Sequence, residues 1–172
     1  MMKPDDFYHQ WFYNATRLFK QEVPLKRTRL ENTPCPTARA LDLIGDWWTL
    51  LIVRDAMRGM TRFSEFQRSL GAAKNILSTR LKTLVAEGIL KVEPAADGSA
   101  YQDYVLTEKG LALQPILVAL GQWGSEYLFE EGEACTRLID TQSRQPLRKI
   151  ELQAQDGRIL QSRDITAIIP EV

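Results

Sequence analysis

Residues 74–107 read KNILSTRLKTLVAEGILKVEPAADGSAYQDYVLT, and this stretch decides the fold. Its first part repeats apolar residues with the 3.6-residue period of an amphipathic helix. Two runs with strand character follow, at residues 89–93 and 101–106, and the loop between them holds Asp97-Gly98, a strong signal for a tight turn. A helix followed directly by a hairpin predicts a winged helix.

The two faces of this helix differ in chemistry. The apolar face consists of Ile76, Leu77, Leu81, Leu84 and Val85. The opposite face and its border carry Lys74, Asn75, Ser78, Thr79, Arg80 and Lys82. We expect the amide and hydroxyl side chains to meet base edges in the major groove of DNA and the basic side chains to meet phosphates. The alternative is an ordinary solvated helix face.

Shorter helices precede this one. Residues 37–57 carry apolar side chains at helical spacing, and Gly45-Asp46 interrupts them, so we expect two helices that meet at a glycine. Residues 61–70 predict a further helix that ends at Gly71. Its apolar face consists of Phe63, Phe66 and Leu70. The arrangement is a helix-turn-helix with a hairpin behind it.

The predicted fold class is α+β and mainly helical. Residues 1–34 predict an N-terminal amphipathic helix and a linker, and residues 35–129 the winged helix-turn-helix domain. That domain closes with one long dimerisation helix, which Thr107 caps and Pro115 kinks. Residues 130–172 contain turn signals between short apolar runs and predict a small β appendage.

Composition excludes several classes of protein. Apolar residues make up 44% and charged residues 26% of the chain, as in ordinary globular proteins. The apolar run at residues 47–53 is too short to cross a bilayer and the first residues show no signal pattern, so we expect a cytoplasmic protein without a membrane partner. With two cysteines and one histidine, we expect no metal and no cofactor. Neither a glycine-rich phosphate loop nor a nucleophile elbow occurs, which argues against an enzyme.

Charge is distributed unevenly along the chain, although the formal net charge is zero. Residues 62–82 hold five bases and one acid, which is a local basic footprint of the kind that DNA phosphates attract. Arg62 belongs to this footprint, so we include it among the DNA-binding candidates. A winged helix that binds only other proteins is the competing class, and binding to duplex DNA at low salt distinguishes the two.

The wing is less basic than its role in DNA binding would suggest. It carries Asp97 in its turn, and Lys91, Gly98 and Ser99 are its candidate contacts to phosphates or to the minor-groove edge. A plain hairpin that only closes the core explains the same residues.

The order of several short motifs resembles one family. They are CP at 35–36, LDLIGDWWTLLI at 41–52, RFSEF at 62–66, ILSTRLKTL at 76–84, EGIL at 87–90 and YVLTEKG at 104–110. In this order and spacing they are similar to the HxlR family of winged helix-turn-helix regulators. The resemblance implies a homodimer that binds an operator, usually as a repressor but sometimes as an activator. In several relatives it also implies a cysteine that senses oxidants or electrophiles. The helix ahead of Cys35 is longer than the family needs, and the tail lacks the cysteine pairs of zinc-ribbon-like appendages.

Apolar side chains outside the winged core predict dimerisation. The candidate interface residues are Phe7, Trp11, Phe19, Ile116, Leu120, Trp123 and Tyr127. Two copies around a twofold axis would place their recognition helices about 34 Å apart, so we expect a palindromic operator. Trp47, Trp48, Trp123 and Tyr127 also fit a small-molecule pocket, although aromatic residues are as common in cores and interfaces.

Cys35 lies between two prolines where a helix is predicted to start. The partial positive charge of a helix N-terminus favours the thiolate, which is the reactive form of a sensing cysteine. An unreactive thiol at a turn is the other interpretation, and the sequence leaves both open.

Overall fold

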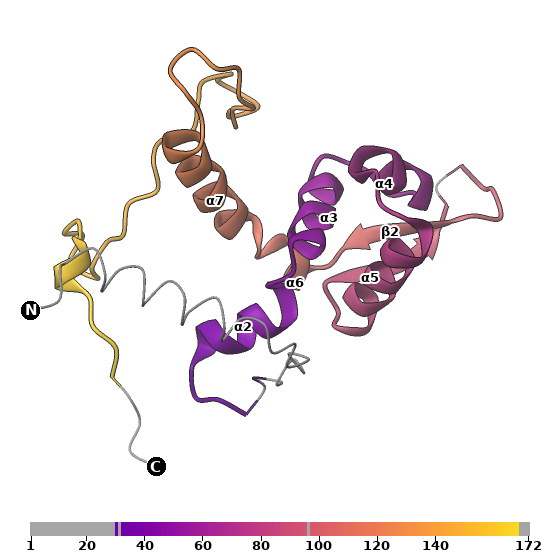
Figure 1. Cartoon of the computed structure of the whole chain (residues 1–172), viewed down its shortest axis with the longest axis horizontal. Coiled ribbons are helices and arrows are strands. Elements are labelled where there is room, and N and C mark those ends of the chain that lie inside the picture. The colour runs from indigo at the N-terminus through magenta and orange to yellow at the C-terminus, as the bar shows by residue number, and fades with distance from the viewer. Residues whose placement is uncertain (1–29, 31, 96, 169–172) are drawn as a thin grey trace, which may run out of the picture.

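The computed structural model describes residues 30, 32–95 and 97–168 (Figure 1). Its elements in chain order are α2 (Pro36–Ile44), α3 (Trp47–Met57), α4 (Phe63–Leu70), α5 (Lys74–Ala86), β1 (Leu90–Pro94), β2 (Gln102–Leu106), α6 (Glu108–Leu111), α7 (Gln114–Tyr127) and the 3-10 turn η1 (Ser162–Asp164). This order confirms the α+β winged helix-turn-helix. The predicted N-terminal amphipathic helix lies outside the described residues.

One apolar core holds the winged domain together. Helices α3, α4 and α5 pack against one another, and the β1–β2 hairpin packs against α3 and α5 (Figure 1). The core residues are Ile44, Ile52, Val53, Phe66, Ala72, Leu77, Leu81, Leu84, Ile89 and Leu90. Full burial of one such aliphatic side chain stabilises the fold by about 1.5–3 kcal/mol. The core therefore fixes the orientation of α5.

Helices α2 and α3 meet at Gly45, as the sequence predicts. A Cβ atom on Gly45 would lie 2.3 Å from the carbonyl oxygen of Leu41, so no larger residue fits there without a shift. Asp46 then caps α3, since its carboxylate accepts hydrogen bonds from the backbone N–H (3.1 Å) and the hydroxyl (2.6 Å) of Thr49. The glycine ends one helix and the aspartate starts the next.

The wing is a two-stranded antiparallel hairpin, as predicted. Its register pairs Leu90 with Leu106 at the base and Pro94 with Gln102 near the tip. Gly98 has φ 73°, which is the left-handed conformation that a tight turn needs and that glycine adopts without strain.

The predicted long helix after the wing is two helices, so that prediction is wrong in its continuity. Thr107 does start the first one, α6, because its hydroxyl accepts the N–H of Gly110 at 3.1 Å. α6 is only four residues long, and α7 begins anew with Pro115 in its first turn. Proline lacks the N–H that would continue α6 but has a φ that suits the start of a helix. It therefore divides the segment instead of kinking it.

The tail beyond α7 contains little regular structure over residues 130–168. Its β structure consists of two isolated antiparallel bridges, Ile139–Pro146 and Gln153–Ile159, and the second encloses the predicted turn at Asp156-Gly157. The tail contacts α7 through Gln122, which donates to the carbonyl of Arg148 and accepts the N–H of Ile150, both at 2.8 Å. The expected β appendage is thus reduced to two bridged turns beside α7.

Candidate nucleic-acid interface

Helix α5 separates its apolar and polar side chains as predicted. Leu77, Leu81 and Leu84 are buried in the core. The exposed polar side chains are Lys74, Asn75, Thr79 and Lys82, and Ser78 is half-buried. Ile76 departs from the prediction, because it is 41% exposed instead of buried. It lies beside the polar face, at the border that a helix of 3.6 residues per turn leaves between core and solvent.

Thr79 has a defined hydrogen-bonding state on this face. Its hydroxyl donates to the carbonyl of Asn75 at 2.8 Å, one turn earlier. A hydroxyl that has used its proton keeps lone pairs that accept hydrogen bonds. In this rotamer Thr79 is an acceptor, which matches the amino groups of adenine and cytosine in the major groove.

The basic residues of α5 differ in how far their charge is available. Arg80 is tied to the cap of α3, with its Nε 3.3 Å from Oδ1 of Asp46. Lys74 and Lys82 are exposed, and neither forms an ion pair with another residue in the part of the chain that the structure describes. The predicted phosphate contacts of α5 therefore divide into two free lysines and one paired arginine.

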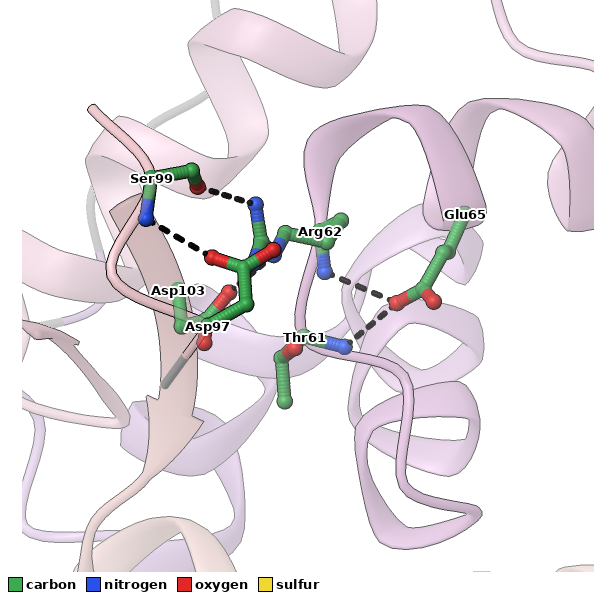
Figure 2. A network of polar contacts seen from close by, with 6 residues as sticks. All are labelled: Thr61, Arg62, Glu65, Asp97, Ser99 and Asp103. Carbon is green, nitrogen blue, oxygen red and sulfur yellow. Dashed lines mark hydrogen bonds and ion pairs between the residues drawn. The ribbon is translucent and has the colours of Figure 1, made fainter. Parts of the chain in front are cut away.

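Helix α4 precedes α5 in the helix-turn-helix and begins at a well-defined cap. The side chain of Glu65 accepts the backbone N–H groups of Thr61 and Arg62, both at 2.9 Å (Figure 2). These two hydrogen bonds lower the pKa of the Glu65 carboxyl. Gly71, in the left-handed conformation with φ 61°, ends the helix as predicted.

Arg62 lies between α4 and the wing and contacts the wing from several sides (Figure 2). Its guanidinium forms ion pairs with Asp97 at 3.0 Å and with Asp103 at 2.5 Å, and it donates to the hydroxyl of Ser99 at 3.3 Å. The sequence grouped Arg62 with the DNA-binding bases because of its charge. Sequence reasoning missed Asp103 as its partner, since only folding brings β2 to the start of α4.

Arg62 and Asp97 each stabilise the charged form of the other. The hydroxyl and backbone N–H of Ser99, followed by Arg62, lower the pKa of Asp97 to about 2. The hydrogen bond that Arg62 donates to Asp97 in turn raises the pKa of Arg62. Both groups stay ionised at neutral pH.

Two wing candidates, Lys91 and Ser99, are in place but already bonded within the protein. Lys91 of β1 lies 2.6 Å from the carboxylate of Glu93, and both side chains are about half exposed. Gly98 is exposed at the tip, whereas Ser99 is half-buried. The wing therefore offers the exposed backbone at Gly98 to a partner, because the Ser99 hydroxyl already contacts Arg62 and Lys91 is paired.

Cys35 is exposed at the N-cap of α2, directly before Pro36, where the sequence predicts it. Its backbone N–H donates to the hydroxyl of Thr33 at 3.3 Å. Arg39 donates from Nε to the Thr33 carbonyl at 2.6 Å, so its guanidinium is bound to the backbone ahead of α2.

The dimer candidates of α7 form an exposed stripe. Ile116, Leu120, Trp123 and Tyr127 are 42%, 48%, 55% and 63% exposed. They follow each other at helical spacing along one side of α7. The tail contacts another side of the helix, where Gln122 forms its hydrogen bonds with Arg148 and Ile150. The candidates Phe7, Trp11 and Phe19 lie outside the described residues.

The four aromatic residues proposed as a pocket do not form one together. Trp47 stacks on Trp48 with ring centroids 4.0 Å apart, and Trp123 lies against Tyr127 at 5.7 Å. A cavity of about 440 Å³ lies instead between α7 and the tail, where Gly121, Cys135 and Leu147 line it. None of the four aromatic residues lines this cavity.

The fold and the exposed face of α5 define a winged helix-turn-helix domain. Residues 43–132 match the family model described as HxlR-like helix-turn-helix, which covers more than half of the chain. The protein belongs to this family. Among the residues that the structure describes, no helix is both long and apolar enough to span a membrane.

Known proteins are similar to this chain in sequence or in structure. The uncharacterised HTH-type transcriptional regulator Rv3095 of Mycobacterium tuberculosis is 44% identical over 90 residues, which cover 52% of this chain and 57% of the relative. The chain thus spans little more than half the length of that relative. YvaP of Bacillus subtilis, also named an HTH-type transcriptional regulator, is 36% identical over 55% of this chain and 89% of its own length. The crystal structure of PA1607, a candidate transcription factor, aligns with 49% identity and a TM-score of 0.78 over 82% of this chain and 99% of its own.

Proposed function

We propose that this protein is a sequence-specific DNA-binding transcriptional regulator that inserts α5 into the major groove. The observation that carries the proposal is the exposed polar face of α5, held on a buried apolar core. Asn75, Ser78 and Thr79 are placed to meet base edges, while Lys74 and Lys82 are free to meet phosphates. Membership of a family of transcriptional regulators supports the same role.

We propose further that the protein acts as a homodimer on a palindromic operator. The exposed stripe of α7 supports this, because large apolar side chains in a row usually mark an interface. A dimer bound across a promoter blocks access of the polymerase, so the proposed sign of regulation is repression. The proposed location is the cytoplasm, where promoter DNA is accessible in bacteria.

An oxidant or electrophile is the signal we propose, with Cys35 as the sensing residue. The exposed thiol at the start of α2 supports access by small molecules. α2 leads through Gly45 to Asp46, which caps α3 and pairs with Arg80 of α5. A modification at Cys35 therefore has a short path of contacts to α5. A Cys35→Ser variant that loses DNA in parallel with the wild type during peroxide or quinone titration would exclude this role.

A direct test is duplex binding at increasing salt, with DNA from upstream of the gene. Changing Lys74 or Lys82 to alanine should weaken binding to all duplexes and reduce the salt slope by about one per lost phosphate contact. Changing Asn75 or Thr79 to alanine should leave that slope unchanged. Equal slopes for the wild type and the double lysine variant would place the DNA elsewhere on the protein.

A second candidate function is a winged helix that binds a protein partner. The observation that favours it is the pairing of Arg62 and Arg80 with carboxylates, which reduces the free positive charge of the predicted footprint. Absence of duplex binding at low salt would support this function over DNA recognition.

A further inference from the structure

The contacts of Arg62 link the start of α4 to the wing turn and to β2. Asp97 and Ser99 belong to the turn itself, whereas Asp103 lies in β2 (Figure 2). Tyr101 adds a cation–π contact, with its ring centroid 5.7 Å from the central carbon of the guanidinium. One side chain therefore touches the hairpin at four points.

The backbone on each side of these contacts is fixed as well. The N–H of Tyr104 in β2 donates to the carbonyl of Thr61 at 2.8 Å, directly before Arg62. The N–H of Ser99 donates to the carboxylate of Asp97 at 3.0 Å. Glu65 holds the N–H of Arg62 itself. The guanidinium thus connects two segments that are each ordered by hydrogen bonds of their own.

The charge at this point leaves little for a phosphate. A single guanidinium faces two carboxylates, and the residue Asp103 is only 7% exposed. A buried carboxylate that loses its cation is costly, so Asp103 holds Arg62 strongly. The side chain of Arg62 is itself only 22% exposed.

We propose that Arg62 is a positioning residue that fixes the wing tip relative to α4 and α5, and that it does not bind a DNA phosphate itself. The wing then meets the duplex through the exposed backbone at Gly98, in a pose that the arginine sets. This inference rests on the proposed binding of duplex DNA.

The test compares Arg62→Gln, Asp97→Asn and the double variant by operator affinity, salt slope and hydroxyl-radical footprint. Loss of the positioning contact predicts that both single variants weaken binding by about three- to tenfold, in line with the loss of a charge-assisted hydrogen bond. The double variant should bind the operator no more weakly than Arg62→Gln does, because both changes remove the same interaction. The protection beside the wing should fade, while the protection under α5 and the salt slope remain.

Two further variants separate positioning from general destabilisation. Arg62→Lys should restore only part of the affinity. The single ammonium group of a lysine cannot contact at once all the partners that the planar guanidinium contacts together. Arg68→Gln removes a base from the same helix without touching the wing, so the wing protection should remain. Thermal unfolding of each variant identifies any that fail to fold, and Asp97→Asn changes an exposed side chain that the core does not need.

Two outcomes would overturn the positioning role of Arg62. If Asp97→Asn strengthens binding and Arg62→Gln lowers the salt slope by about one, Arg62 contacts a phosphate and the inference is wrong. It is also wrong if Asp97→Asn alters neither affinity nor footprint.

If the wild type binds no duplex, the proposed function fails first. The amide of Ala95 donates to the carbonyl of Tyr101 across the wing turn at 3.2 Å. Hydrogen exchange of the Ala95 and Tyr104 amides then tests the positioning role in the free protein, because Arg62→Gln should accelerate both; unchanged rates would overturn it.

Discussion

Arg80 on α5 and Asp46 at the start of α3 form an ion pair, with Nε and Oδ1 3.3 Å apart. Asp46 also accepts two hydrogen bonds from Thr49, so one carboxylate caps α3 and holds α5. Asp46→Ala should lower the free energy of unfolding by about 1 kcal/mol through loss of the cap alone. Asp46→Asn keeps a capping oxygen and should cost less. Urea unfolding measures both, and equal losses would show that the charge, instead of the cap, is what matters.

Dimerisation should depend on the exposed stripe of α7. Trp123→Glu introduces a charge into the proposed interface and should convert the protein to a monomer at micromolar concentration, because burial of an unpaired carboxylate is costly. Gln114→Glu, on another side of the same helix, is the matched control and should leave the dimer intact. Sedimentation velocity measures the difference. A wild type that is already a stable monomer, with or without residues 1–24, would contradict the dimer.

Two glycines predict opposite effects of the same substitution. A Cβ on Gly110 would lie 2.3 Å from the carbonyl oxygen of Ile89, so Gly110→Ala should destabilise the fold by about 1–3 kcal/mol. Gly121 lies inside α7 with nothing within 4 Å of the same position. Gly121→Ala should therefore be neutral or stabilise by up to about 1 kcal/mol. Thermal unfolding of the two variants tests the packing of α6 against the wing.

The wing turn should be insensitive to pH near neutrality. The pKa of Asp97 is lowered to about 2, first by Ser99 and then by Arg62. A lowered carboxyl pKa stabilises the fold fully above the unfolded value of about 3.9, and this contribution is lost as the pH falls toward 2. A carbon-detected NMR titration should place the midpoint of Asp97 near 2. Ser99→Ala should raise it more than Arg62→Gln does, and an ordinary midpoint in the wild type would contradict these contacts.

Local backbone signals made most of the winged domain predictable. Gly45 and Gly71 end helices because a close carbonyl or a positive φ requires glycine there, and Gly98 marks the turn for the same reason. The core of α5 follows from the spacing of its leucines. Pro115 misled the prediction, since the same residue suits either a kinked helix or the first turn of a new one.

The ion-pair partners of the site residues were harder to predict than the positions of these residues. The exposed face of α5 follows from periodicity, but the partners of Arg62 and Arg80 come from distant parts of the chain. Charge counted along the sequence treats each arginine as free, whereas folding brings Asp103 and Asp46 beside them. The tail was predicted as a small β appendage because its turns are a local signal, whereas the β structure of residues 130–168 consists of only two isolated bridges.

The central claim is that the exposed face of α5 reads a DNA sequence. It is tested most directly by selection of duplexes from a random pool with the wild type and with an Asn75→Ala, Thr79→Ala double variant. We predict that the wild type enriches a palindrome with half-sites about one helical turn, or a multiple of it, apart. The double variant should lose preference at a few positions in each half-site while it still binds duplex at about 50 mM salt, where phosphate contacts suffice. Enrichment of the same sequence by both proteins, or of none by the wild type, would contradict the account.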